Sequence, residues 1–291
     1  MRIEVFDERI CSLGEGPFAT GALRNEVSWV DITGSRVLTR NLKTDETGEF
    51  STGENGGFAI PRASGGYVLG TNSGPILRDI DGHTHPFLRL SDFEPLTSKM
   101  KIRWNDAKIA PSGSLWFGTM GYEMLVGTSS LFKYDITNST TSKMLPNLTV
   151  SNGMDWSNDG STFYFIDSNW QAVHAFTVID DELSDERTVI EIPKSDGEPD
   201  GMCMDSQGGL WVALWGGSQV RRYDSADNFK LDQVIELPVP FVTSCAFAGP
   251  DLDTLIITSA TDDQVGGPKE AGMTFWVKPG VTGRPSRSFS L

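Results

Sequence analysis

The stretch "EPDGMCMDSQGGLWVAL", residues 198–214, contains the pattern that decides the fold. An acidic residue, Asp200, is followed at once by glycine, by apolar residues, by a glycine-rich turn and by an apolar run containing Trp211. Two short apolar runs on either side of such a turn predict a pair of adjacent β-strands. A carboxylate at the start of a buried strand is unusual, because burying a charge without a partner is costly.

The same pattern occurs six times along the chain. Successive units begin 42, 48, 47, 48 and 44 residues apart, at Glu15, Gly57, Asn105, Asn152, Asp200 and Ser244. In five units a large aromatic residue opens the second strand, where it would fill the space between neighbouring sheets: Trp29, Tyr67, Trp116, Tyr164 and Trp211. A period in the mid-forties with about four strands per unit is typical of a β-propeller blade.

We therefore predict an all-β fold, a six-bladed β-propeller that forms a single domain over residues 1–291. Its blades would be four-stranded antiparallel sheets around a central channel. The segment "RIEVF" at residues 2–6 is expected to pair with the last blade and close the ring, since an open propeller leaves strand edges unpaired. A β-sandwich with coincidental spacing is the alternative.

The composition of the chain argues against several classes of partner and location. The chain has 291 residues and a formal net charge of −15, so nucleic acid and anionic membrane surfaces are poor partners. It has no apolar run long enough to cross a membrane, and its first residues lack the apolar core of a signal peptide. The three cysteines are widely spaced and form no CxxC pair, which indicates reduced thiols and a cytoplasmic protein. No segment has the pattern of an interface, so we expect a monomer.

Residues at one phase of a propeller repeat converge on the channel. Five oxygen-bearing side chains share that phase, namely Glu15, Asn105, Asn152, Asp200 and Ser244. A glycine after the carboxylate would let the inner strands approach closely. Oxygen ligands suit one divalent cation, with Ca²⁺, Mg²⁺ or Mn²⁺ preferred over Zn²⁺ or Fe²⁺. The alternative is that these side chains only cap turns.

Further candidates flank this ring. Arg103 lies two residues before Asn105 and would share its strand face, where a guanidinium can anchor hydroxyls or a carboxylate. The alternative for Arg103 is a surface ion pair. Glu123, three residues after "GTM", could reach over the channel from the next loop. His83 and His85 are expected in a solvated loop rather than in a zinc site. The chain has no G-x-S-x-G motif and no phosphate-binding glycine loop.

The chain resembles the SMP-30/gluconolactonase/luciferin-regenerating enzyme family, the regucalcin-like proteins. The resemblance rests on four blocks in the family's order: "SLGEGP" at 12–17, "RWNDAKIAPSGSLWFGTM" at 103–120, "SNGMDWSNDGSTFYFIDS" at 151–168 and "EPDGMCMDSQGGLWVALWGGSQVRRYD" at 198–224. The ending "GPKEAGMTFWVKPGVTGRP" at 267–285 is also similar to that of the family. The segment at 81–100 matches no family pattern, and in the family such loops cover the channel and select the substrate.

The resemblance implies a role for each matching residue. Glu15, Asn152 and Asp200 match the family's ligands for one catalytic divalent cation, and Asp200 also matches its general base. Arg103 and Asn105 match the residues that contact the substrate, and Asp106 completes their "R-x-N-D" block. Glu123 stands where some members place a substrate-binding glutamate.

These expectations favour a metal-dependent lactonase that hydrolyses a sugar lactone, such as gluconolactone or a related pentonolactone, to the aldonic acid. A bound cation could equally polarise the carbonyl of another ester or the P=O of a phosphoester, so a hydrolase of other esters, lactones or phosphoesters is the first alternative. A Ca²⁺-binding propeller without catalysis is the second.

Overall fold

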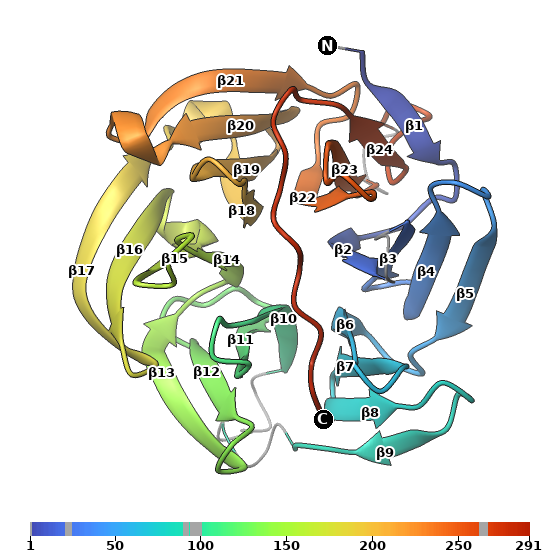
Figure 1. Cartoon of the computed structure of the whole chain (residues 1–291), viewed down its shortest axis with the longest axis vertical. Helices are drawn as coiled ribbons and strands as arrows, with labels where there is room; N and C mark the ends of the chain where they lie inside the picture. Colours follow the sequence, from blue (N-terminus) through green and yellow to red (C-terminus); the bar gives the residue numbers. More distant parts are fainter. Residues whose placement is uncertain (1, 21–24, 90–92, 94–100, 262–266) are drawn as a thin grey trace.

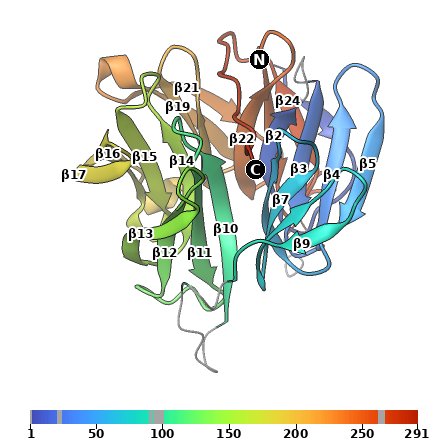
Figure 2. The same ribbon diagram turned by 60° about the horizontal axis from the view of Figure 1, so that its bottom comes forward.

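The computed structural model describes residues 2–20, 25–89, 93, 101–261 and 267–291. Within them, six four-stranded antiparallel sheets surround a central axis (Figure 1). The turned view in Figure 2 shows the blades standing side by side around that axis. The predicted all-β class and the six-bladed propeller are confirmed. The residues 90–92 and 94–100 of the expected covering loop lie outside the described part of the chain.

The first five blades each use four consecutive strands, and the first strand of each lies next to the channel. Their bounds are β2 (Gly14–Thr20), β3 (Glu26–Asp31), β4 (Arg36–Asn41) and β5 (Thr47–Ser51); β6 (Gly56–Pro61), β7 (Tyr67–Thr71), β8 (Gly74–Arg78) and β9 (Thr84–Pro86); β10 (Ile102–Ile109), β11 (Leu115–Gly121), β12 (Ser129–Asp135) and β13 (Thr140–Leu148); β14 (Ser151–Trp156), β15 (Thr162–Asp167), β16 (Ala172–Ile179) and β17 (Glu182–Glu191); β18 (Glu198–Met204), β19 (Gly209–Trp215), β20 (Gln219–Asp224) and β21 (Lys230–Glu236).

The sixth blade joins the two ends of the chain. It consists of β22 (Val242–Ala248), β23 (Thr254–Ser259), β24 (Thr274–Val277) and, as its outer strand, β1 (Glu4–Asp7). Val5 on β1 lies opposite Phe275 on β24 in an antiparallel pair. The predicted closure by the N-terminal strand is confirmed, and it protects the edge of the last sheet.

Aromatic side chains fill the space between blades, as the repeat predicted. Trp29, Trp116 and Trp211 are fully buried. Trp116 of the third blade meets Phe163 of the fourth blade with ring centroids 4.8 Å apart. Such contacts tie neighbouring sheets together, so the inner strands are held at fixed positions around the channel.

Every inner strand carries an irregularity at the same place. The antiparallel register of β2, β6, β10, β14, β18 and β22 shifts close to the strand's start, for example between Trp104 and Ala107 and between Pro199 and Met202. A bulge leaves residues out of the ladder and re-aims their side chains. Asn105, Asn152 and Asp200 fall within these shifts, which explains how they turn toward the channel.

Glycine is required near the bulges of the inner strands for two different reasons. A Cβ on Gly201 would lie 2.2 Å from Ser244 Oγ, and one on Gly153 would lie 2.7 Å from the carbonyl oxygen of Asp200. Close approach of neighbouring inner strands therefore requires these two glycines, and the sequence predicted this for Gly201, which follows the carboxylate of Asp200. Gly16 has free space around it but a φ of +52°, so its backbone conformation is the reason for glycine there.

The C-terminal segment crosses one end of the channel as a strap (Figure 1, red). Gly283 forms a bridge with Asp205 in the fifth blade. Phe289 is fully buried, and its N–H donates to the carbonyl of Pro61 in the second blade at 2.9 Å. The strap thus connects distant blades. No helix among the described residues is long and apolar enough to cross a membrane.

Candidate functional site in the central channel

Glu15, Asn152 and Asp200 come together from the first, fourth and fifth blades. Their side chains are almost entirely enclosed, with 8%, 5% and 7% of each residue exposed. The Asp200 carboxyl lies beside both Glu15 and Asn152. Residues separated by up to 185 positions (200 − 15) therefore share one site. Ser244, on the next inner strand, packs against Gly201 beside Asp200.

The surroundings of the Glu15 and Asp200 carboxyls make their ionised forms unfavourable. Burial, followed by the charge of Asp106, raises the pKa of Glu15 to about 8. Burial, then the charges of Glu15 and Asp106, raises the pKa of Asp200 well above its ordinary value. Neither Glu15 nor Asp200 forms an ion pair within the described part of the chain. The nearby charge of Arg103 lowers the pKa of Glu15 but does not offset the effect of burial. A cation bound between the two buried acids would stabilise their charged forms.

A chain of hydrogen bonds, all donated in the same direction, connects the site to its neighbours. Arg103 Nη1 donates to Asn105 Oδ1 at 2.6 Å, and Asn105 Nδ2 donates to Asn152 Oδ1 at 3.1 Å. Asn152 Nδ2 then donates to Ser168 Oγ at 2.9 Å. The chain ends where the Ser168 hydroxyl donates to the carbonyl of Pro199 at 2.7 Å. Pro199 directly precedes Asp200, so this relay joins three blades around the site.

The relay fixes the orientation of the Asn152 amide. Because the Ser168 hydroxyl gives its only proton to Pro199, its oxygen must accept from the amide nitrogen of Asn152. The amide oxygen of Asn152 is thereby turned away from Ser168, toward Asn105. Asp167, whose carboxylate accepts from the N–H groups of Thr149 and Val150, holds the loop that leads into β14.

Sequence reasoning missed Ser168 and Tyr122. Ser168 ends the block "FIDS" that carried the resemblance, but nothing in that block indicates that its hydroxyl contacts Asn152. The Tyr122 hydroxyl accepts from Asn55 at 3.1 Å and donates to Asn72 at 3.0 Å, linking the second and third blades. Tyr122 also interacts electrostatically with Arg103, so it lies near the same part of the channel.

Two of the three predicted substrate-contacting residues join the buried site. Arg103 and Asn105 are 7% and 6% exposed and belong to the relay. Burial lowers the pKa of Arg103, while Tyr122, Glu15 and Asp200 oppose this shift. Glu123 is exposed on the loop after β11, beside Lys101 and Thr128, so its substrate-binding role stays a prediction.

The chemistry of the donor set fits a hard divalent cation. Two carboxyls and one oriented amide oxygen are the ligand types that Ca²⁺, Mg²⁺ and Mn²⁺ prefer. Among the described residues, no group of three or more His, Cys, Asp or Glu side chains is placed to hold a metal ion, so the candidate ligand set consists of two carboxyls and the Asn152 amide. His83 and His85 have 80% and 59% of their side chains exposed, as expected for solvated residues. His83 lies in a loop as predicted, whereas His85 lies on the outer strand β9, where its Nε2 is 2.8 Å from Asp79 Oδ2.

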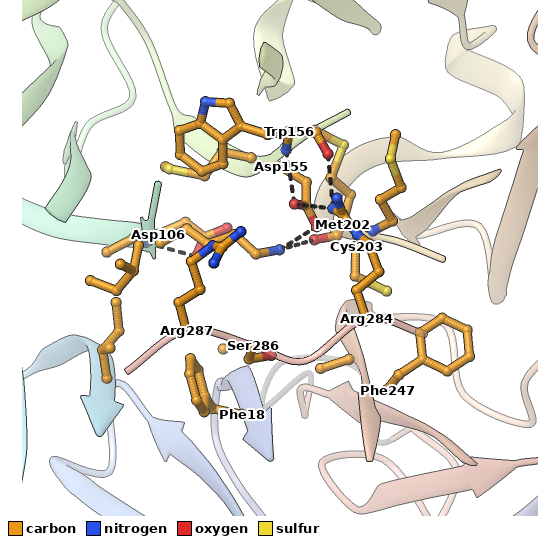
Figure 3. A pocket seen from close by; sticks show the side chains of 18 of the residues that line it. Phe18, Asp106, Asp155, Trp156, Met202, Cys203, Phe247, Arg284, Ser286 and Arg287 are labelled. Atoms are coloured by element: carbon orange, nitrogen blue, oxygen red, sulfur yellow. Dashed lines mark hydrogen bonds and ion pairs between the residues drawn. The ribbon is translucent and has the colours of Figure 1, made fainter. Parts of the chain in front are cut away.

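The other half of the channel contains a cavity of about 400 Å³. Later residues of the inner strands line it together with residues 284–287 of the strap (Figure 3). Asp155 lies at its wall and pairs with Lys108 and Arg284, each at 2.7 Å. Glu15, Asn152 and Asp200 do not line this cavity, whereas Asp106 does. Asp106, whose pKa burial raises to about 6, therefore lies between the cavity and the acid pair.

The fold and site together define a six-bladed propeller with a buried carboxyl–amide site in its channel. Residues 13–261 match the family model described as "SMP-30/Gluconolactonase/LRE-like region", and the chain belongs to this family. It is 34% identical to a regucalcin of Danio rerio over 270 residues, which cover 90% of each chain. It is 37% identical over 258 residues to a putative sugar lactone lactonase of Bacillus subtilis, covering 86% of this chain and 84% of the relative.

Solved structures of similar proteins agree with this family assignment. A luciferin-regenerating enzyme superposes with a TM-score of 0.90 at 26% identity and covers 100% of this chain and 99% of its own. A calcium-binding protein from Agrobacterium tumefaciens, described as regucalcin, also reaches a TM-score of 0.90 at 26% identity, covering 99% of this chain and 97% of its own. The resemblance identified from the sequence blocks is confirmed.

Proposed function

We propose that the chain is a lactonase that depends on one divalent cation and opens a sugar lactone, such as gluconolactone or a related pentonolactone, to the aldonic acid. The observation that carries the proposal is the buried Glu15–Asp200 acid pair, which forms no ion pair among the described residues and lies beside the Arg103–Asn105–Asn152 relay. Membership of the family and the sugar-lactone lactonase name of the Bacillus subtilis relative support it.

Glu15, Asn152 and Asp200 would hold the cation. When bound, it would polarise the lactone carbonyl and make a water more acidic. Its positive charge would also offset the effects of burial and of neighbouring carboxylates that raise the pKa of both carboxyls, so that Asp200 would be ionised at neutral pH. The candidate cations are Ca²⁺, Mg²⁺, Mn²⁺, Zn²⁺ and Fe²⁺.

Asp200 is then the general base. Its carboxylate would take a proton from the attacking water and return it to the alkoxide that leaves when the ring opens. The position of Asp200 at a bulge, backed by Gly201 against Ser244, holds the carboxylate in place. Hydrolysis adds one water across the ester bond, so no further reactant is needed.

Arg103 and Asn105 would hold the ring hydroxyls. Only Nη1 of Arg103 has a hydrogen-bond partner among the described residues, so its other N–H groups are available to a ligand. Fixing the lactone in this way presents its carbonyl to the nucleophile, which lowers the entropic part of the barrier. Glu123 is a further candidate for such a contact from the loop after β11.

The test is acid release in a pH-stat with gluconolactone, xylonolactone, a homoserine lactone and a paraoxon-like ester, with and without each cation. We expect cation-dependent turnover of a sugar lactone above the spontaneous rate. Asp200→Asn at saturating cation should lower kcat by about 100-fold or more. The exposed Asp227→Asn serves as the matched control and should leave kcat unchanged.

Three results would overturn the proposal. If no lactone is turned over with any cation, the protein is a non-catalytic cation-binding propeller or has another activity. Preferred turnover of the paraoxon-like ester would make it an esterase or phosphoesterase. Full activity after exhaustive chelation would remove the cation from the mechanism.

A further inference from the structure

Two of the three cysteines lie in contact across a blade boundary. Cys203 on β18 and Cys245 on β22 are 42 residues apart in sequence, and their sulfur atoms are 3.6 Å apart. Both side chains are buried, at 6% and 3% exposure, and both line the 400 Å³ cavity at the end of the channel away from Asp200 (Figure 3 labels Cys203). Neither is in a disulfide.

We propose that Cys203 and Cys245 form a redox modification site, where a small hydroperoxide closes a disulfide between the fifth and sixth blades. The third cysteine, Cys11, is also buried but does not line this cavity. A sulfur separation of 3.6 Å is close to van der Waals contact, and forming an S–S bond of about 2.05 Å requires the two sulfur atoms to move closer by about 1.5 Å.

The peroxide is the only oxidant that the formation of the disulfide requires. One thiol loses its proton, and the resulting thiolate attacks the peroxide, breaking the O–O bond and giving a sulfenic acid and a hydroxide that takes up the proton. The second thiol then attacks the sulfenic sulfur, forming the S–S bond and releasing water. The two thiols lose two electrons, and the peroxide gains them. Disulfide-reducing thiols reverse the bond.

The cavity gives a small oxidant access to the two thiols. They face a space that the strap partly covers with Arg284, Ser286 and Arg287. A peroxide is about the size of two waters and fits this space. In the folded protein we therefore expect hydrogen peroxide to reach both thiols.

The thiol environment makes the reaction slow at neutral pH. Burial, followed by the neighbouring Cys245 thiol, raises the pKa of Cys203 well above its ordinary value. Lys108 opposes this rise and Asp155 adds to it. Because only the thiolate attacks, the rate should rise about tenfold per pH unit below that pKa. The site would record prolonged exposure to peroxide rather than a brief pulse.

The bond would tie together two strands that flank the proposed active site. Cys203 is three residues beyond Asp200 on β18, and Gly201 already packs against Ser244 on β22. A covalent link at this point restricts separation of the two inner strands. The oxidised protein should therefore unfold at a higher temperature than the reduced protein.

The experiment treats the full chain with hydrogen peroxide at pH 7, 8 and 9, and then counts free thiols after denaturation. We expect three thiols to fall to one, the intact mass to fall by two hydrogens, and a cross-linked peptide pair to contain Cys203 and Cys245. Cys11→Ser should still form the bond. Cys203→Ser and Cys245→Ser should form no intramolecular disulfide under the same treatment.

The proposal is overturned if three thiols remain after treatment at pH 9. It is also overturned if the cross-link contains Cys11, if the disulfide joins two molecules, or if sulfinic acid accumulates without a cross-link. None of these readouts depends on lactonase activity, so they stand apart from the proposed function.

Discussion

Replacing Gly201 by alanine tests whether close approach of the inner strands positions Asp200. The added Cβ would lie 2.2 Å from Oγ, 2.5 Å from Cβ and 2.9 Å from Cα of Ser244. Real Cβ atoms do not approach other atoms this closely, and the contact with Cα means that rotation of the Ser244 side chain cannot relieve the clash. The backbone of β18 or β22 must therefore move.

The expected cost is at the upper end of the range for overpacking, about 3 kcal/mol. With an unfolding entropy of about 2.1 cal/mol/K per residue, this lowers the Tm by about 5 °C for a chain of this size. The shift of β18 also displaces Asp200, so kcat should fall as well. Removing the opposing side chain in Gly201→Ala/Ser244→Gly should restore part of both losses.

The assay is thermal unfolding, with lactone turnover measured on the same samples. Gly267→Ala is the matched control, because among the described residues its Cβ would meet Ala271 Cβ alone, at an ordinary contact distance of 3.7 Å. Equal Tm and kcat in Gly201→Ala and in the parent would refute the steric argument. So would a double variant that is no better than the single one.

Three other predictions concern the acid pair, the relay and the strap. In the folded, chelated protein Glu15 keeps its proton up to about pH 8, whereas the unfolded chain releases this proton above its ordinary pKa of 4.5. The free energy of unfolding should therefore fall as the pH rises from about 4.5 toward about 8. The expected slope is up to about 1.4 kcal/mol per pH unit. Urea titrations at several pH values should show this slope, and an equal slope in Glu15→Gln would contradict it. Ser168→Ala removes the hydrogen bond that orients the Asn152 amide, so it should weaken cation binding, measured by calorimetry, about tenfold. Replacing the exposed Ser195 by alanine is the control and should leave the affinity unchanged. Equal affinities in Ser168→Ala and the parent would show that Ser168 does not contribute to the site. Phe289→Ala should cost about 3 to 5 kcal/mol of stability, and unchanged urea unfolding would show that the strap does not contribute.

The repeat made most of the fold predictable from the sequence. A fixed period with an aromatic residue in each second strand leaves few architectures other than a propeller, and the same phase that located the inner strands also located Glu15, Asn152 and Asp200. These three residues could be found because one structural rule, convergence on the axis, acts on every unit alike.

Features that depend on contacts between particular segments could not be read in this way. The bulges that turn Asn105 and Asp200 toward the channel leave no mark in a pattern of apolar residues. Ser168 acts through Asn152, the strap crosses from the last blade to the second, and the Cys203–Cys245 contact pairs residues of different units. Each depends on distances across the ring, which the sequence alone does not give.

The most direct test of the central claim is a map of anomalous scattering from crystals grown with Mn²⁺. We predict a single strong peak in the channel, in contact with the carboxylates of Glu15 and Asp200 and with Oδ1 of Asn152. A channel without a peak at saturating Mn²⁺, or a peak that touches none of these three side chains, would contradict the account.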